Sequence, residues 1–190
     1  IHRFSNEYPG IHISLSVKPA PVIREMLEKH QIDLGIISTE PFISAELQTE
    51  AICEDDLVLI LSPDHVLAAQ PEPTADQIAS SPFILHGMES SPRRFAEKWL
   101  ESNRLRLPFS LELDSLEAIK QAVMLGKYVS FVSRMSVEDE VQRGLLQMRK
   151  IPDNEAKRYV YMATNRNRHP SALLRKFTAH LSQCLNPDQQ

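Results

Sequence analysis

Apolar and polar residues alternate along this chain in blocks that predict strands and helices in turn. Residues 11–17 (IHISLSV) carry an apolar side chain at every second position, which is the pattern of a half-buried strand. The run 57–61 (LVLIL) is apolar throughout, as in strands covered on both faces. Residues 22–30 and 92–103 instead repeat apolar side chains at helical spacing. The alternation of the two patterns predicts an α/β fold.

The full pattern predicts nine strands and seven helices. The strands are expected at 11–17, 31–37, 46–53, 57–61, 83–85, 109–113, 128–132, 145–151 and 157–163. The helices are expected at 1–8, 22–30, 75–78, 92–103, 116–125, from 133 onward, and 170–185. Nine strands are many for one open sheet in a chain of this length, so we expect two lobes. No long linker separates them, which predicts that the chain crosses between lobes within strands.

Residues 113–144 give the clearest local pattern. Asp114 and Ser115 are N-cap residues at the start of an amphipathic helix, which Gly126 ends. A short strand at 128–132 follows, and a second amphipathic helix begins directly after it. Two helix N-termini therefore follow two strands in quick succession. Free backbone N–H groups and the positive end of the helix dipole favour an anionic ligand at such turns.

Composition and charge exclude several functional classes. The net charge is −4, whereas a nucleic-acid-binding surface usually appears as a basic excess. The sequence shows no signal peptide and no apolar run near the length of a membrane span. Cys53 and Cys184 are far apart and follow no pattern, so we expect free thiols in a reducing cytoplasm.

The sequence shows no pattern typical of catalysis or metal binding. It contains no C-x-x-C, no H-E-x-x-H and no phosphate-binding glycine motif. Its seven histidines fall on different predicted elements. Because no nucleophile, base or metal-ligand set is assembled, we expect neither an enzyme nor a bound cofactor or metal ion.

Five segments in order resemble the effector-binding domain of LysR-type transcriptional regulators. They are FSNEYPG (4–10), IHISLSV (11–17), IREMLEKHQIDLGII (23–37), EDDLVLILSPDHVLA (54–68) and LDSLEAIKQAVMLGKYVSFVS (113–133). Each segment alone is weak, but the ordered set at this spacing covers nearly the whole chain. Two further details, SLEAIKQAV and YMATNRNR, are similar to regulators of carbon fixation and, less closely, of sulfur assimilation.

The resemblance implies an α/β fold with two Rossmann-like lobes of the type II periplasmic-binding-protein kind and a ligand cleft between them. Lobe I is expected at 1–54 and 157–190, and lobe II at 55–156. Family domains open with a strand and a loop that supplies a Ser or Thr to the ligand. This chain begins at Ile1, inside a predicted helix, so we expect that strand to be missing. Tyr128 stands where the family usually has a second glycine after Gly126.

The resemblance also implies a function and partners. We expect an effector-sensing domain that binds a small, anionic metabolite and controls oligomer geometry and DNA-dependent transcription in the cytoplasm. DNA would be bound by an upstream winged helix-turn-helix domain, with a homodimer formed near residues 1–8 and 11–17 and a tetramer in the full-length protein. An extracytoplasmic solute-binding protein of the same fold is the alternative.

Two segments of lobe I are candidate ligand contacts by analogy with the family. Lys18, Pro19 and Ala20 form a turn at a helix N-terminus, where Lys18 could pair with a carboxylate or phosphate. The alternative is a solvated surface lysine. Ser38 and Thr39 are expected to follow a buried strand at a position where the family contacts its ligand. Their alternative is a simple turn.

Two loops of lobe II supply further candidates. His86, Ser90 and Ser91 lie between a predicted strand and a helix, where the serines could both cap the helix and bind an anion. His86 is either a hydrogen-bond donor to the ligand or a packed loop histidine. Asp114 and Ser115 open the next helix, and capping alone is the alternative to a ligand contact.

The last candidates follow the strand at 128–132. Ser133 and Arg134 end that strand, and the planar guanidinium of Arg134 matches a carboxylate or phosphate. A surface ion pair with Glu138 is the alternative role for Arg134. Arg93 and Arg94 are interpreted as solvated helix charges.

Overall fold

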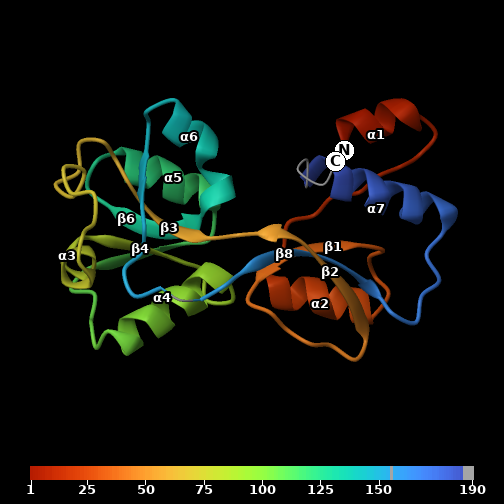
Figure 1. The fold of residues 1–190 in the computed structure, drawn as a ribbon, viewed down its shortest axis with the longest axis horizontal. Coiled ribbons are helices and arrows are strands. Elements are labelled where there is room, and N and C mark those ends of the chain that lie inside the picture. Colours follow the sequence, from red (N-terminus) through yellow and green to blue (C-terminus); the bar gives the residue numbers. More distant parts are fainter. Residues whose placement is uncertain (155, 186–190) are drawn as a thin grey trace. The chain divides into compact units, whose positions relative to one another are not determined.

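The computed structural model describes residues 1–154 and 156–185 of the chain. The chain divides into two compact units. Unit 1 comprises Ile1–Glu54 and the chain from Arg158 onward, and unit 2 comprises Asp55–Lys157. Each unit contains one β-sheet with helices packed against it (Figure 1). No helix among the described residues has the length and apolar character needed to cross a membrane.

Unit 1 is built on a three-stranded sheet with the order β1-β8-β2. Its central strand, β8, runs antiparallel to both neighbours, with Ser38 opposite Val160 and Ala51 opposite Tyr161. Its elements are α1 (His2–Glu7), α2 (Ala20–Glu28), β1 (Gly35–Thr39), β2 (Leu47–Glu54), β8 (Tyr159–Asn165) and α7 (Ala172–Leu185).

Helix α2 covers one face of the sheet in unit 1 (Figure 1). Leu27 on the helix packs with Ile37, Leu47 and Ala163 on the three strands, and all four are buried. The helix lies close to β1, because a Cβ on Gly35 would stand 2.6 Å from a methyl carbon of Ile23. Glycine therefore sets the spacing between α2 and the sheet.

The prediction of a strand at 11–17 is wrong. These residues follow α1 without forming a ladder with any strand that the structure describes. Ile11 and Ile13 are half-buried, but Leu15 is 74% exposed and Val17 is 90% exposed. Alternating side chains indicate a strand only where a neighbouring strand accepts its backbone hydrogen bonds.

Other elements also differ in their bounds from the sequence prediction. Strand β1 begins at Gly35 rather than residue 31. Helix α2 ends at Glu28, and His30, two residues later, lies in the left-handed region with φ of 56°. The strand expected at 145–151 is limited to β7, which covers Gln147–Arg149. The helix expected from residue 133 is a 3₁₀ turn, η1 (Arg134–Ser136), followed by the short helix α6 (Glu138–Gln142).

Unit 2 is built on a five-stranded mixed sheet with the order β5-β4-β6-β3-β7. Strand β4 runs parallel to β5 and β6, whereas β3 runs antiparallel to β6 and β7. Its remaining elements are β3 (Leu57–Leu61), α3 (Ala75–Ser80), β4 (Phe83–His86), α4 (Ser91–Ser102), β5 (Ser110–Leu113), α5 (Leu116–Met124) and β6 (Val129–Ser133).

Strand β3 is covered on both faces, as its continuous apolar sequence predicted. All five of its residues are buried. Leu59 and its same-face neighbours pack with Trp99 of α4 and Phe131 of β6. Ile60 packs on the other face with Ile119 and Val123 of α5. Figure 1 shows α4 and α5 on opposite sides of this sheet, which gives unit 2 a core on each face.

His65, in the loop after β3, is a buried ionisable group. Its Nδ1 accepts a hydrogen bond from the backbone N–H of Leu67 at 3.2 Å. Burial lowers the pKa of His65 below its ordinary value of 6.5, although a backbone contact with Lys127 acts in the opposite direction. The native state therefore binds fewer protons than the unfolded state just below that pH.

We expect the contribution of His65 to stability to be complete above about pH 6.5 and to be lost as the pH falls through the lowered pKa. Urea unfolding at about pH 7.5 and about pH 5 measures this effect. The free energy of unfolding should change less between the two pH values in His65→Gln than in the unaltered chain. The exposed His12 provides the control, since His12→Gln should keep the full dependence. Equal pH dependence in all three proteins would contradict this role of His65.

Candidate functional site

The candidate residues of unit 2 lie at one edge of its sheet. Strands β5, β4 and β6 are parallel neighbours, so their carboxyl ends meet at the same edge. These ends are Leu113, His86 and Ser133. Each is followed by a short connection and the start of α5, α4 or η1. Ligands of open α/β sheets bind at the carboxyl ends of strands, which makes this edge the candidate site of unit 2.

Two serines cap the helices at this edge. The Ser90 hydroxyl accepts a hydrogen bond from the Arg93 backbone N–H at 3.2 Å, and Ser115 accepts one from Ala118 at 3.4 Å. The predicted capping roles of Ser90 and Ser115 are therefore confirmed, whereas Ser91 is the first residue of α4 and not its cap. Capping uses one N–H of each first turn, and the positive end of each helix dipole still points to this edge.

Asp114 is not an N-cap, which corrects the sequence prediction. Ser115 is the N-cap of α5, and Asp114 is an exposed residue just before it. A Cβ on Gly87 would stand 2.2 Å from the Asp114 carboxylate oxygen. The loops after β4 and β5 therefore touch, and glycine at 87 leaves room for the carboxylate.

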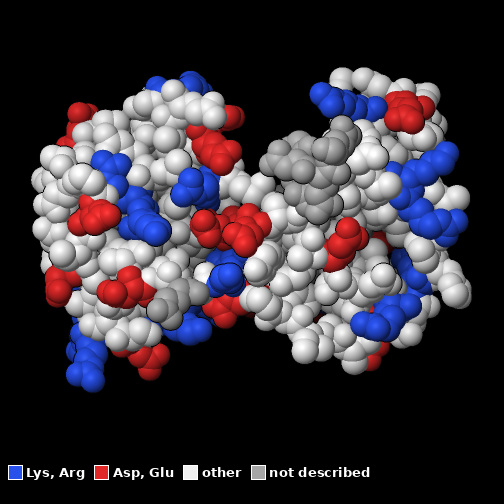
Figure 2. Space-filling view, in the orientation of Figure 1, with Lys and Arg blue, Asp and Glu red and all other residues white. Residues whose placement is uncertain are grey.

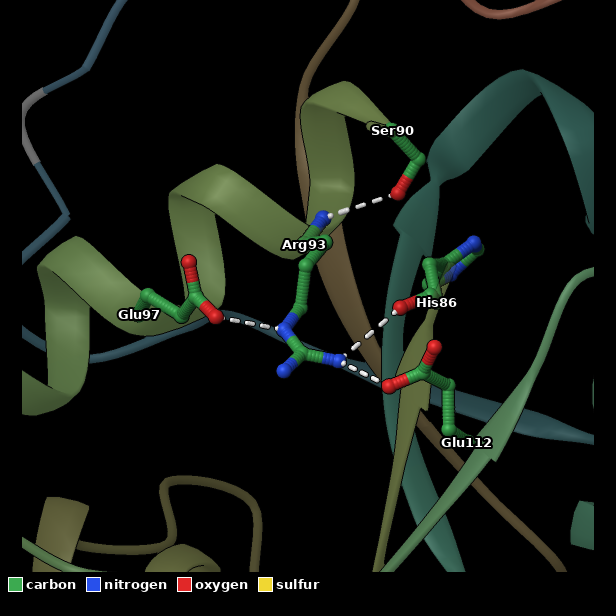
Figure 3. Close-up of polar contacts among 5 residues, drawn as sticks. All are labelled: His86, Ser90, Arg93, Glu97 and Glu112. Carbon is green, nitrogen blue, oxygen red and sulfur yellow. Dashed lines mark hydrogen bonds and ion pairs between the residues drawn. The ribbon is translucent and has the colours of Figure 1, made fainter. Parts of the chain in front are cut away.

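His86 is held by the sheet. Its ring Nε2 lies 2.9 Å from the carbonyl oxygen of Phe131 on β6 and donates to it when that nitrogen carries the proton. Its own carbonyl accepts a hydrogen bond from Arg93 Nη1 at 3.2 Å (Figure 3). These contacts agree with the packed-histidine alternative for His86.

Arg93 is not a solvated helix charge, which corrects the sequence interpretation. Its side chain is only 12% exposed. Its guanidinium pairs with Glu97 at 2.6 Å and with Glu112 of β5 at 2.8 Å (Figure 3). Burial alone would lower the pKa of Arg93, but the two carboxylates outweigh it and raise that pKa. Arg93 thus fixes the start of α4 to β4 and β5, and the charge is neutralised within unit 2.

Ser133 and Arg134 differ in how the structure uses them. The Ser133 hydroxyl donates to the carboxylate of the buried Asp55. The backbone N–H of Arg134 donates to the carbonyl oxygen of Asp56 at 2.9 Å, and the side chain of Arg134 is exposed. Within the described residues the Arg134 side chain forms no ion pair, so the predicted alternative with Glu138 is absent. Arg134 is thus a cation at the carboxyl end of β6 that the described residues leave unneutralised.

The candidate residues of unit 1 also meet at one end of their sheet. Helix α2 begins at Ala20, with Pro19 as an N-cap that supplies no side-chain hydrogen bond. The Arg24 guanidinium, one turn into α2, lies 3.8 Å above the ring of Phe42, which follows β1. The start of α2 and the end of β1 are therefore neighbours. Lys18 precedes this helix, is exposed and forms no ion pair with the described residues.

Ser38 and Thr39 are the last two residues of β1, whereas the sequence predicted that they follow it. Thr39 is buried and Ser38 is half-buried. Arg158, just before β8, donates through Nη2 to the Ser38 hydroxyl at 2.8 Å. Sequence analysis missed Arg158, because only the pairing of β1 with β8 brings residues 38 and 158 together.

Surface features away from these strand ends do not involve the candidate residues. One hollow of about 250 Å³ is lined by α1 and α7, and another of about 470 Å³ is lined by α6, β7 and their neighbours. Basic and acidic side chains are interspersed on the face shown in Figure 2. In the described ranges no group of three or more His, Cys, Asp and Glu side chains could hold a metal ion. Neither Cys53 nor Cys184 forms a disulfide within the part of the chain that the structure describes.

Comparison with known proteins decides the family. A family model described as the LysR substrate binding domain matches residues 1–185. The chain belongs to this family. The HTH-type transcriptional regulator YeiE of Escherichia coli strain K12 is 33% identical over 177 residues, which cover 93% of this chain and 60% of that protein. A probable RuBisCO transcriptional regulator of Gracilaria tenuistipitata var. liui is 30% identical over 186 residues, which cover 95% of this chain and 60% of that protein.

A solved structure supports the same assignment. The CcmR regulatory domain of Synechocystis PCC6803, solved in complex with 2-PG, matches with a TM-score of 0.86 and 27% identity. The match covers 98% of this chain and 89% of that one. The α/β fold of the LysR regulatory domains expected from the sequence is thereby confirmed. The sequence relatives are named as regulators rather than enzymes, which agrees with the expectation and does not favour the solute-binding alternative. The chain spans about 60% of the length of these relatives.

Proposed function

We propose that this LysR substrate-binding domain senses a small, anionic metabolite for a transcriptional regulator. The observation that carries the proposal is the meeting of three parallel strand ends with two capped helix N-termini in unit 2. Such an edge favours negative charge through backbone N–H groups and helix dipoles. CcmR, which is 27% identical to this chain, was solved with 2-PG, and this supports a small-molecule ligand here as well.

The proposed site combines residues of both units. Units 1 and 2 act as the two lobes, and the ligand lies in a cleft between them. Lys18 and Arg134 anchor the negative charge, because both are exposed cations at these strand and helix ends. Backbone groups and hydroxyls complete the set at Pro19, Ala20, Ser38, Thr39, His86, Ser90, Ser91, Asp114, Ser115 and Ser133.

The proposed mechanism is a shift in equilibrium between lobe arrangements. The effector favours the arrangement that it binds more tightly, and the size of the shift is set by its differential affinity. In the full-length protein this arrangement controls oligomer geometry and the spacing of upstream winged helix-turn-helix domains on DNA. We propose a homodimer through α1 and residues 11–17, a tetramer of the full-length regulator, and a cytoplasmic location. The exposed apolar side chains of Leu15 and Val17 support such a contact.

A thermal-shift titration tests ligand binding. The panel contains 2-PG, inorganic phosphate, citrate and succinate, with sodium chloride at matched ionic strength as the control. We expect a saturable rise in the melting temperature with at least one of the four anions, because ligands that bind only the native state stabilise it. A rise no greater than that of the matched salt for all four would contradict the proposal.

A further inference from the structure

Arg93 connects the start of α4 to two strands of unit 2 through different nitrogens of its guanidinium. Its side chain is only 12% exposed. Nε donates to Glu97, one turn further along α4, at 2.6 Å. Nη1 donates to Glu112 of β5 at 2.8 Å and to the His86 carbonyl of β4 at 3.2 Å (Figure 3). The rigid spacing of these two nitrogens fixes the three acceptors relative to one another.

The same contacts reach all three parallel strand ends of the candidate site in unit 2. The backbone N–H of Arg93 donates to the Ser90 hydroxyl, so Arg93 also contacts the cap of α4. His86 continues the connection to β6, because its ring Nε2 lies 2.9 Å from the Phe131 carbonyl oxygen. Glu112 is the last residue but one of β5. Arg93 therefore joins the carboxyl ends of β4, β5 and β6 to the first turn of α4.

The charge of Arg93 is neutralised by its partners. Its guanidinium forms ion pairs with the carboxylates of both Glu97 and Glu112. One cation between two carboxylates adds no net positive charge that would attract an anion. Arg93 therefore differs from Lys18 and Arg134, which are proposed to bind the charge of the ligand directly. Its effect on ligand binding is exerted through the position of the segments that it joins.

We propose that Arg93 is a positioning residue of the effector site. It holds the loop at 86–91 and the residues after β5 in the arrangement that binds a small carboxylate or phosphate anion. Ordering a loop on binding costs free energy, and a loop that is already held in place avoids that cost. The inference rests on the proposed function and adds a residue that acts through these loops.

The two glutamates provide a matched pair for the test. Glu112→Ala and Glu97→Ala each remove one negative charge from the same guanidinium, and the two side chains are 48% and 50% exposed. Loss of a negative charge alone would strengthen the binding of an anion in both variants. Glu112 joins α4 to β5, whereas Glu97 contacts Arg93 within α4. The positioning role therefore predicts weaker binding only in Glu112→Ala.

Calorimetry with 2-PG, below the melting temperature of every variant, measures the affinities. We expect Glu112→Ala to weaken binding about threefold to tenfold. Glu97→Ala should leave the affinity unchanged or slightly higher. Arg93→Lys should weaken binding about tenfold, because lysine keeps the charge but cannot reproduce contacts made by two rigidly spaced nitrogens.

Arg149→Lys is the control for a general loss of stability. The Arg149 guanidinium donates to the carbonyls of Ala68 and Gln70, in the loop after β3. Because β3 runs antiparallel to β6, this loop leaves the opposite edge of the sheet from the candidate site. Arg149→Lys should therefore destabilise unit 2 without changing the affinity for 2-PG.

The outcomes separate this inference from the proposed function. The positioning role is overturned, while ligand sensing stands, if Glu112→Ala binds 2-PG as tightly as Glu97→Ala or if Arg93→Lys keeps full affinity. An equal loss of affinity in Arg149→Lys and Arg93→Lys would overturn it as well. If 2-PG does not bind the unaltered chain, the variants are compared with whichever of phosphate, citrate or succinate does bind. If none of the four binds, the proposed function fails and this inference is overturned with it.

Discussion

Replacing Phe131 with alanine is expected to lower the free energy of unfolding by about 3–5 kcal/mol, the usual cost of removing a buried aromatic side chain. Phe131 is 1% exposed at the centre of the sheet in unit 2. Its ring centroid lies 4.9 Å from that of Phe83, 5.7 Å from that of Phe95 and 5.1 Å from that of Trp99, all edge-on. The truncation leaves a cavity and removes three aromatic contacts at once.

Urea unfolding measures this loss, and Phe109 supplies the matched control. Phe109 is 50% exposed in the same unit, so Phe109→Ala should cost less than about 1 kcal/mol. Losses of equal size in the two variants would show that the cluster around Phe131 does not form the core of unit 2.

Replacing Arg134 with alanine is expected to weaken effector binding by about 1.5–3 kcal/mol, the range of a hydrogen bond to a charged group. This corresponds to roughly a tenfold to 150-fold rise in Kd. Arg134 is an exposed cation at the end of β6, and no ion pair with the described residues competes for its guanidinium. Lys18→Ala should also lower the affinity for the effector, because Lys18 is the corresponding exposed cation in unit 1.

Calorimetry of these variants includes Arg106→Ala as the control. Arg106 is exposed and precedes β5, so it lies toward the opposite edge of the sheet from the candidate site. Its removal should leave affinity unchanged apart from a small effect of net charge. Unchanged affinity in both Lys18→Ala and Arg134→Ala would contradict an anionic ligand at these strand ends.

The sequence predicts best where a local pattern alone determines the structure. Strand β3 was predicted with its observed bounds, because a continuous apolar run needs only cover on both faces. The prediction of a strand at 11–17, which rested on alternating apolar and polar side chains, was wrong. The alternation is present, but no described strand pairs with this backbone. Strand formation depends on a neighbour, and the alternating pattern says nothing of whether one is present.

The candidate site shows the same division. The caps Ser90 and Ser115 follow from local strand, loop and helix patterns, and both were predicted. Arg93 was misread and Arg158 was missed, because each has a partner that is distant in sequence. Arg93 pairs with Glu112, and Arg158 binds Ser38 across 120 residues. Only the register of the sheets brings these groups together.

The most direct test of the central claim is an NMR titration that follows the backbone amides of the domain, because the proposed site consists largely of N–H groups. The probes are 2-PG, phosphate, citrate and succinate. The account predicts saturable shifts concentrated at residues 18, 20, 38–39, 86–91, 114–115 and 133–134, proline at 19 having no amide N–H. Shifts concentrated instead around the hollow beside β7, or no saturable shift with any of the four anions, would contradict it.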